Sequence, residues 1–196
     1  MNKTRLDHKI IYGIIESESK VLDLGCGDGD LLAFLVKKKK VKAQGIELSE
    51  AAIYECVEKG LSVLHGDIES GLSNYPDKSF DYVILNQSMQ EVKNVDYVIK
   101  EALRVGKKII IGFSNFTYLS ARFRIFFKGK VPITKSLPYR WYNTPNVHFL
   151  SIKDFRDFCR DKNLKIISTF YLGNKRTINF LPNLFALNAI FVISPK

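Results

Sequence analysis

The residues best suited to chemistry are three glycines at alternate positions, directly after a short apolar run. Residues 21–24 read VLDL, residues 25–29 read GCGDG, and leucines at helical spacing begin at Leu31. This order predicts a strand, a tight glycine turn and a helix, as in the ligand-binding loop of a βαβ unit. Glycines in such a loop let backbone N–H groups approach a ligand without a Cβ in the way.

Asp23, the acid just before the turn, narrows the class of ligand. A loop that cradles pyrophosphate needs a neutral or positive entrance, whereas a carboxylate there favours a cationic or hydroxyl-bearing ligand. The spacing Gly25-x-Gly27-x-Gly29 also differs from the G-x-G-x-x-G spacing of dinucleotide-binding loops. Both observations argue against a dinucleotide.

Two further carboxylates end the next two predicted strands. Residues 42–47 read KAQGIE, and Glu47 lies 18 residues after Gly29, a distance that fits one helix and one strand. This spacing places Glu47 beside the ribose hydroxyls of a nucleoside in the loop. The next short strand, residues 61–64, leads to Asp67. Any one of these acids could be a solvated strand end or a helix N-cap, but three on consecutive strands indicate a ligand site at that edge.

The elements that must position these residues alternate along the chain. Helices are predicted at residues 6–15, 28–36, 49–58, 95–104 and 151–159, and strands at residues 20–24, 42–47, 61–64, 80–85, 108–113, 165–171 and 189–194. The alternation predicts an α/β fold with a mainly parallel sheet covered on both faces, and with the last two strands as an antiparallel pair at its edge. A length of 196 residues fits one domain.

Two details of this pattern are also predicted. The first helix is expected to be a plain surface helix, although Asp7, His8 and Tyr12 on it could cover the ligand pocket. Gly106 is expected to close the helix of residues 95–104.

The net charge of +10 is concentrated in one stretch of the chain. Residues 102–153 contain no Asp or Glu, but they hold Arg104, Lys107, Lys108, Arg122, Arg124, Lys128, Lys130, Lys135, Arg140 and Lys153. The rest of the chain is therefore neutral. A solvated face usually mixes the two signs, so this stretch predicts an anionic partner: nucleic acid, an acidic protein surface or a phosphorylated substrate.

Residues 115–148 have no place in the predicted sheet. Residues 117–128 place Leu119, Phe123, Phe126 and Phe127 at helical spacing, and residues 135–148 contain two prolines, several aromatics and the only tryptophan. This composition predicts an ordered lid or docking loop in place of a flexible linker.

Several classes of protein are not indicated. Cys26, Cys56 and Cys159 are far apart and the three histidines stand alone, so neither a disulfide framework nor a metal site is predicted. The N-terminus is polar, and the apolar stretch of residues 180–193 is too short and too broken to span a membrane. We expect a cytoplasmic protein without a membrane partner.

The string D-L-G-C-G-D-G resembles motif I of the class I S-adenosylmethionine (SAM) methyltransferases. A narrower resemblance, over residues 21–158, is to the methionine-biosynthesis protein W (MetW) family. It rests on residues 76–85, Gln87, Gln90, residues 104–106 and, above all, P-x-T-K-x-L-P-Y-x-W-Y-x-T-P-N-x-H from Pro132 to His148. The resemblance implies a Rossmann-like fold with a seven-stranded mixed sheet of order 3-2-1-4-5-7-6. Residues 1–196 would then form a single SAM-binding domain with a lid or docking insertion at about 115–148.

The resemblance also implies the site residues. SAM or S-adenosylhomocysteine is expected at Asp23, Gly25, Cys26, Gly27, Asp28, Gly29, Glu47, Leu48, Asp67, Ile68, Asn86 and Gln87. In this superfamily an acid in the position of Asp67 faces the adenine amino group. Gln87, Gln90 and His148 are the candidate catalytic residues, expected to converge near the SAM methyl, with Tyr142 helping to shape an acceptor site.

Three functions remain open at this point. The first, implied by the resemblance, is a SAM-binding protein of methionine biosynthesis that acts with homoserine O-acyltransferase. The second is a SAM-dependent methyltransferase for an unidentified small molecule, and the third and least favoured is modification of RNA. Asn86-Gln87-Ser88-Met89 lacks the prolines that follow this Asn in adenine-N6 and glutamine methyltransferases. Since methyl transfer from a sulfonium can proceed by positioning alone, this leaves enzymatic activity undecided.

Overall fold

Seven strands in the described part of the chain form one mixed sheet. A computed structural model describes residues 5–70 and 72–196 and gives the strand order β3-β2-β1-β4-β5-β7-β6, which confirms the predicted order. The strands are β1 (Lys20–Leu24), β2 (Lys42–Glu47), β3 (Ser62–His65), β4 (Phe80–Asn86), β5 (Gly106–Ser114), β6 (Leu164–Leu172) and β7 (Asn188–Pro195). The first five run parallel, and β7 pairs antiparallel with both β5 and β6.

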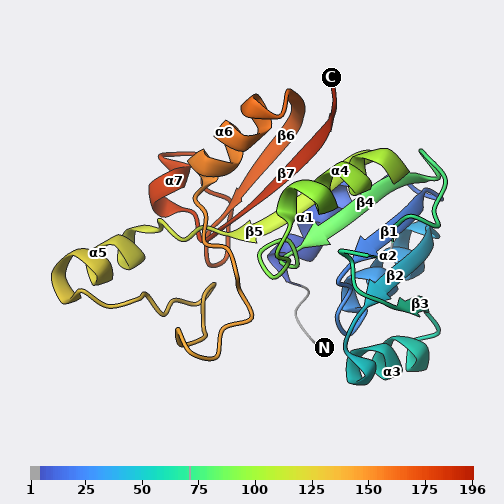
Figure 1. The fold of residues 1–196 in the computed structure, drawn as a ribbon, viewed down its shortest axis with the longest axis horizontal. Coiled ribbons are helices and arrows are strands. Elements are labelled where there is room, and N and C mark those ends of the chain that lie inside the picture. Colours follow the sequence, from blue (N-terminus) through green and yellow to red (C-terminus); the bar gives the residue numbers. More distant parts are fainter. Residues whose placement is uncertain (1–4, 71) are drawn as a thin grey trace.

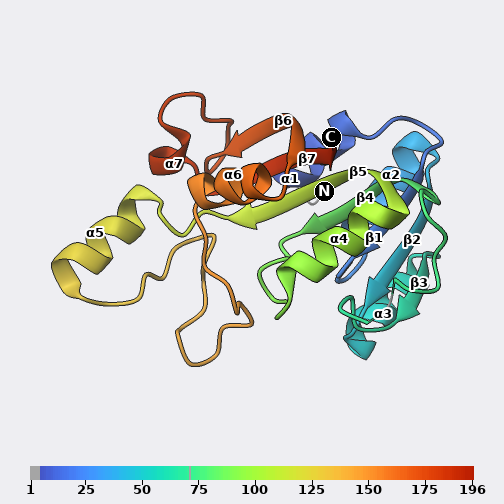
Figure 2. The ribbon, with the colours of Figure 1, turned by 45° about the horizontal axis from the view of Figure 1, so that its top comes forward.

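Helices cover both faces of this sheet (Figures 1 and 2). The helices of the described chain are α1 (Leu6–Ile14), α2 (Asp30–Lys39), α3 (Glu50–Glu58), α4 (Val95–Val105), α5 (Leu119–Lys128), α6 (Ile152–Asp161) and the short α7 (Pro182–Phe185), and α5 is not part of the cover. One core cluster joins α4 and α6 to alternate strand residues such as Leu22 and Val83, and the other joins α1 and α2 to Val21 and Ile84. Burial on both faces explains why the central strands are continuous apolar runs.

The parallel strands place the predicted site residues at one edge of the sheet. β1, β2 and β4 all end there, so the glycine turn, Glu47 and Asn86 are neighbours. Gly25, Gly27 and Gly29 have φ angles of 75°, 54° and 76°, in the left-handed region that favours glycine. The turn between β1 and α2 therefore needs these glycines for its backbone shape.

Helix α1 is not the plain surface helix that was predicted. Asp7 and His8 are buried, and the side-chain Nδ2 of Asn86 donates to Asp7 Oδ2 at 3.0 Å. The spacing of the isoleucines correctly indicated an amphipathic helix, since Ile11 is fully buried. The prediction was wrong because the polar flank of this helix also packs, against the end of β4.

Gly106 ends α4, as predicted, and it does so in an extended conformation. Its φ is −105°, and it is the first residue of β5. A Cβ at this position would lie 2.6 Å from Val83 Cγ2 and 3.1 Å from the carbonyl oxygen of Ala102. Close packing of β5 against β4 and α4, and not a turn, is what requires glycine here.

Helix α5 and the chain that follows it extend away from the sheet (Figures 1 and 2). Residues 129–151 contain neither helix nor strand. The two ends of the excursion are held together at the edge of the sheet, where Phe116 N donates to Leu150 O at 3.0 Å. Leu137 within it is buried.

In the ranges 5–70 and 72–196, none of the helices is long and apolar enough to cross a membrane.

Candidate functional site

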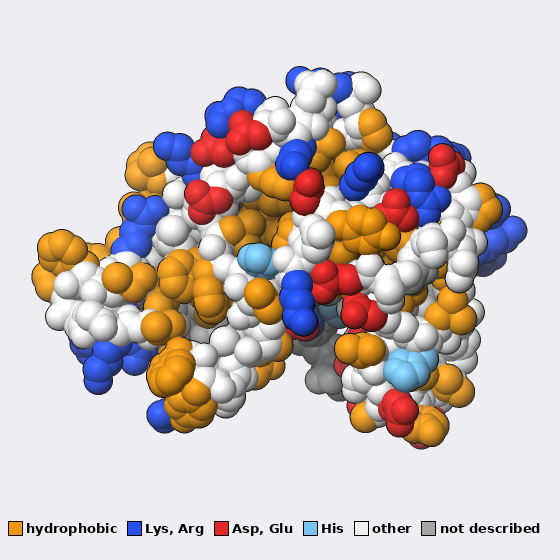
Figure 3. All heavy atoms as spheres, in the orientation of Figure 1, with side chains coloured by type: hydrophobic (Ala, Val, Ile, Leu, Met, Phe, Trp, Pro, Cys, Tyr) orange, Lys and Arg blue, Asp and Glu red, His pale blue; other side chains and the backbone are white. Residues whose placement is uncertain are grey.

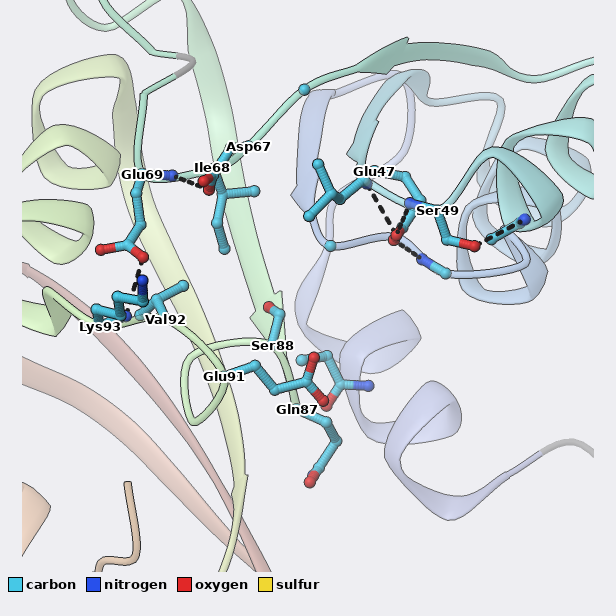
Figure 4. A pocket seen from close by; sticks show the side chains of 16 residues that line it. Glu47, Ser49, Asp67, Ile68, Glu69, Gln87, Ser88, Glu91, Val92 and Lys93 are labelled. Atoms are coloured by element: carbon cyan, nitrogen blue, oxygen red, sulfur yellow. Dashed lines mark hydrogen bonds between the residues drawn. The ribbon is translucent and has the colours of Figure 1, made fainter. Parts of the chain in front are cut away.

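A cavity of about 580 Å³ opens at the carboxyl edge of β1, β2 and β4 (Figure 4). It is lined by the glycine turn, the segments after β2, β3 and β4, and the start of α3: Gly25, Gly27, Glu47, Leu48, Ser49, Ala52, Gly66, Asp67, Ile68, Glu69, Asn86, Gln87, Ser88, Glu91, Val92 and Lys93. A volume of this size is typical of a small-molecule site.

The glycine turn leaves room for a ligand at one residue. An added Cβ at Gly27 would meet nothing within 4 Å, whereas one at Gly25 would lie 2.7 Å from Ser88 Cβ. A Cβ at Gly29 would lie 2.7 Å from Cys56 Sγ and 2.5 Å from Leu61 Cδ1. Gly27 therefore faces open space in the cavity, while Gly25 and Gly29 are required by close packing.

Glu47 holds the turn in place. Its Oε2 accepts a hydrogen bond from Gly27 N at 2.8 Å, and its Oε1 accepts from Leu48 N and Ser49 N, both at 2.9 Å. The carboxylate thus joins the end of β2 to the glycine turn. A carboxylate has about four acceptor positions, so Glu47 keeps the capacity to accept from a ligand hydroxyl.

Asp23, Cys26, Asp28 and Gly29 do not line the cavity. Asp23 is buried, and burial together with the nearby charge of Glu47 raises its pKa to about 7. Cys26 is buried with its Sγ close to Gly45, and burial raises the pKa of this thiol far above its usual range. Asp28 Oδ1 accepts from Asp30 N at 3.0 Å at the start of α2. These residues therefore contribute to the shape of the turn and not to the lining of the cavity.

The opposite wall comes from the chain after β3. Asp67 and Ile68 line it, and Asp67 Oδ1 accepts from Glu69 N at 2.9 Å. Glu69 accepts from the backbone N–H groups of Lys93 and Asn94 at 3.0 and 2.7 Å, and these two bonds lower its pKa. Figure 4 shows Glu47 and Glu69 on opposite sides of the cavity.

Sequence reasoning missed part of the site, namely Ser49, Ala52, Gly66, Glu69, Ser88, Glu91, Val92 and Lys93. Burial and the charge of Glu47 raise the pKa of Glu91. Four carboxylates (Glu47, Asp67, Glu69 and Glu91) and one ammonium, on Lys93, therefore surround the space. For residues 88–93, the available signal was that they follow Gln87 directly at the same edge of the sheet. The acidic lining suits a ligand that carries positive charge and hydroxyl groups.

Asn86 and Gln87 line the cavity, but their side chains are already engaged. Asn86 binds Asp7, and its buried Oδ1 has no partner within the described chain. Gln87 has a φ of 74°, and its Oε1 accepts from Ser114 Oγ at 3.0 Å. Ser114 Oγ also lies 2.8 Å from Ser136 O and 3.1 Å from Asn188 Oδ1.

Gln90 and His148 were expected to converge at the ligand site, but neither of them lines the cavity. Gln90 is buried, and its side-chain Oε1 accepts from Ser114 N at 2.8 Å. Its carbonyl oxygen accepts from Val147 N and His148 N, and His148 Nε2 lies 3.2 Å from Lys93 O. Tyr142 is exposed and is also absent from the lining. The Gln90 side chain forms hydrogen bonds with backbone groups of β5 and of the insertion, and these bonds determine where its amide points.

In the part of the chain that the structure describes, His, Cys, Asp and Glu side chains form no group of three or more that could hold a metal ion.

Comparison with protein families identifies the chain. The family model of methionine biosynthesis protein MetW matches residues 5–193. The chain belongs to the MetW family. A curated relative, the bifunctional methionine biosynthesis protein MetXA/MetW of Rhodopirellula baltica, is 36% identical over 170 residues, which cover 82% of this chain and 27% of the relative. The chain thus spans about a quarter of that relative's length.

More distant similarities concern methyltransferases. The demethylmenaquinone methyltransferase of Anoxybacillus flavithermus is 24% identical over 82% of this chain and 80% of the relative. A solved SAM-dependent methyltransferase from Thermotoga maritima has a TM-score of 0.70 and 20% identity over 97% of this chain and 89% of that one. Another, from Archaeoglobus fulgidus, has a TM-score of 0.67 and 14% identity over 95% and 93%. These structures show that the MetW chain has the Rossmann-like SAM methyltransferase fold.

Proposed function

We propose that this MetW chain binds SAM or S-adenosylhomocysteine in the acidic cavity and acts with homoserine O-acyltransferase in methionine biosynthesis. The observation that carries the proposal is the cavity itself, an acid-lined space over a glycine turn in a SAM methyltransferase fold. The combined MetXA/MetW name of the Rhodopirellula baltica relative supports the pairing with the acyltransferase. A role in amino-acid biosynthesis would place the protein in the cytoplasm.

The lining residues fit SAM. Open space over Gly27 leaves room for the ligand against the backbone of the turn, and Glu47 has acceptor capacity for the ribose hydroxyls. Leu48 and Ile68 supply apolar surface for the adenine, and Asp67 can accept from its amino group. The acids of the lining balance the positive sulfonium and amino groups. When bound, SAM supplies a methyl group on a sulfonium that is a good leaving group.

Methyl transfer to a small molecule is the second candidate function. Glu91 favours it, because this carboxyl lines the cavity and its pKa is raised by burial and by the charge of Glu47, a shift that is common among groups at catalytic sites. Gln87 borders the same space. Gln90 and His148, which contact backbone groups elsewhere, are not part of this second proposal.

One set of measurements tests both functions. Calorimetry with SAM and with S-adenosylhomocysteine measures binding to the chain, and the acyltransferase is assayed with and without it. In parallel, methyl-labelled SAM is incubated with the chain and homoserine-pathway metabolites. We expect saturable binding and a change in acyltransferase activity without label transfer. Transfer of label by the wild type, lost in Glu91→Gln, would favour the methyltransferase, and absence of any binding would contradict both.

A further inference from the structure

Helix α5 and the chain after it expose an unusual amount of apolar surface. Eleven large apolar side chains between residues 119 and 149 are exposed, among them Phe126 at 82% and Trp141 at 74%. Figure 3 shows hydrophobic side chains gathered over this part of the molecule, with Lys and Arg along its lower edge. We call the exposed apolar side chains of residues 119–149 the aromatic face. Exposed patches of this kind mark interaction sites on proteins.

The rings of the aromatic face are arranged before any partner binds. Phe123 and Phe127 stack with their centroids 5.4 Å apart, and Phe126 meets Phe127 edge-on at 4.9 Å. Trp141 and Tyr142 form a second edge-on pair at 5.6 Å. Rings that already constrain one another lose little conformational entropy on binding, and aromatic anchors dominate the energy of protein interfaces.

The second property of this surface is its unpaired positive charge. Of the ten basic residues between positions 102 and 153, three pair with acids elsewhere: Arg104 with Asp77 and Glu101, Lys107 with Asp81, and Lys108 with Glu16. The other seven, at positions 122–153, form no ion pair with any carboxylate of the described chain. The unpaired positive charge therefore surrounds the aromatic face.

A groove lies at the root of α5. Arg122, Lys153 and Arg156 border a cavity of about 410 Å³, and Tyr171, Leu181 and Leu184 supply much of its apolar lining. Arg122 lies one helical turn from Phe126, so the groove continues the aromatic face. A hollow with an apolar lining and three cations around it accepts an apolar side chain that has a carboxylate beside it.

The charge pattern decides between two kinds of occupant. A two-fold contact between two copies of this chain would place the same surface against itself. Because residues 102–153 contain no acid, such a contact would bring like charges together. A partner with Asp and Glu around an apolar patch would instead be attracted and correctly oriented.

We infer that the aromatic face and the groove beside Arg122 form one docking surface for a partner whose apolar side chains are flanked by carboxylates. The inference rests on the proposed function in one respect: the partner is the homoserine O-acyltransferase. The SAM cavity is lined by none of these residues. The docking surface and the ligand site therefore share no lining residue, and a substitution in one removes no side chain of the other.

Two double variants of the full chain test the surface. Phe126→Ser with Phe127→Ser removes two anchors, and Arg122→Glu with Arg156→Glu reverses the charge around the groove. Matched controls on exposed positions are Tyr54→Ser with Val57→Ser on α3, and Lys37→Glu with Lys38→Glu on α2. Affinity for the acyltransferase of the same organism is measured by biolayer interferometry at several salt concentrations, with thermal melting as the check on folding.

We expect the phenylalanine variant to weaken binding at least thirtyfold and the arginine variant at least tenfold, the latter with a smaller salt dependence. Both controls should bind like the wild type. Binding that is equal in the wild type and in both variants would overturn the docking surface and leave the proposed function intact. A wild type that does not bind the enzyme at all would overturn both. Self-association in sedimentation experiments, abolished by Phe126→Ser with Phe127→Ser, would replace the acidic partner with a second copy.

Discussion

The acidic cavity and the aromatic face differ in charge and in how their side chains are held. In the cavity, Glu47 is fixed by backbone N–H groups of the glycine turn and of the segment after β2, and Glu69 by those of the two residues before α4. On the aromatic face, rings such as Phe123 and Phe127 contact one another and are surrounded by unpaired cations. The fixed carboxylates suit the small cationic ligand that we propose for the cavity, and the wide apolar face suits the macromolecular partner that we infer for it.

The largest expected effect separates two glycines of the same turn. Gly27→Ala and Gly29→Ala both place an alanine at a positive φ, which costs about 1–2 kcal/mol of stability. Gly29→Ala adds contact with Leu61 and Cys56, so we expect a total loss of about 2–5 kcal/mol. Gly27→Ala should instead weaken SAM binding, because its Cβ enters the cavity. Urea unfolding and calorimetry measure the two effects.

Binding to the acyltransferase serves as the control measurement for the two glycine variants. Both glycine variants, measured at a temperature where they are folded, should bind the acyltransferase with unchanged affinity. A loss of docking in Gly27→Ala would break the separation between the two regions, and equal stability of the two variants would contradict the packing assigned to Gly29.

Glu47→Ala tests the ligand site with a smaller change. Removing the carboxylate deletes the acceptor that we propose for the ribose and frees the glycine turn from β2. We expect SAM affinity to fall by about 1.5–3 kcal/mol, the scale of hydrogen bonds to a charged group. Calorimetry measures this, with Glu55→Ala on the exposed side of α3 as the control. An unchanged dissociation constant would remove Glu47 from the ligand site.

Gln90→Ala probes the contact between the two regions. The change leaves the buried N–H of Ser114 without its partner, which costs about 1–3 kcal/mol. We expect lower stability and faster hydrogen exchange at Ser114, with little change in SAM affinity, because Gln90 does not line the cavity. Mass spectrometry of exchanged peptides checks this. A variant of normal stability that loses SAM binding would return Gln90 to the ligand site.

The last expected effect concerns pH. Asp23 has its pKa raised to about 7 in the folded protein, so the folded state holds a proton that the unfolded state releases near pH 4. Stability therefore falls as the pH rises from about 4 to 7, by about 1 kcal/mol between pH 6 and 7. Asp23→Asn cannot titrate and should remove this part of the slope. Urea unfolding at pH 5, 6, 7 and 8 gives the comparison, and parallel slopes in the two proteins would contradict the assignment.

The sheet and the glycine turn could be predicted because their signals are local. Each strand is an apolar run, and the carboxyl ends of parallel strands must share an edge, so Glu47 and Asp67 could be assigned to it before the structure was known. Glu69 and Glu91 could not, since their place depends on how the chain returns after β3 and β4. No local pattern distinguishes them from acids on the surface.

Side-chain direction and charge pairing were the least predictable features. Gln90 lies near the expected sheet edge, but unpaired backbone groups of β5 and the insertion decide where its amide points. Similarly, the run of ten basic residues is read from sequence as one patch. Asp77, Asp81 and Glu16 come from other parts of the chain and pair with three of its members. Only tertiary structure divides this run into a neutralised part and a free part.

Ser114 has a consequence for communication across the molecule. Its hydroxyl has a single proton to donate, yet oxygens of Gln87, Ser136 and Asn188 all lie within reach. These acceptors belong to the cavity wall, the insertion and β7, so a ligand that recruits Gln87 changes which of the others the hydroxyl serves. Any resulting energetic coupling is reciprocal: if bound SAM tightened docking tenfold, docking would tighten SAM binding tenfold. A ligand in the cavity and a partner on the docking surface would then influence each other through one rotating hydroxyl.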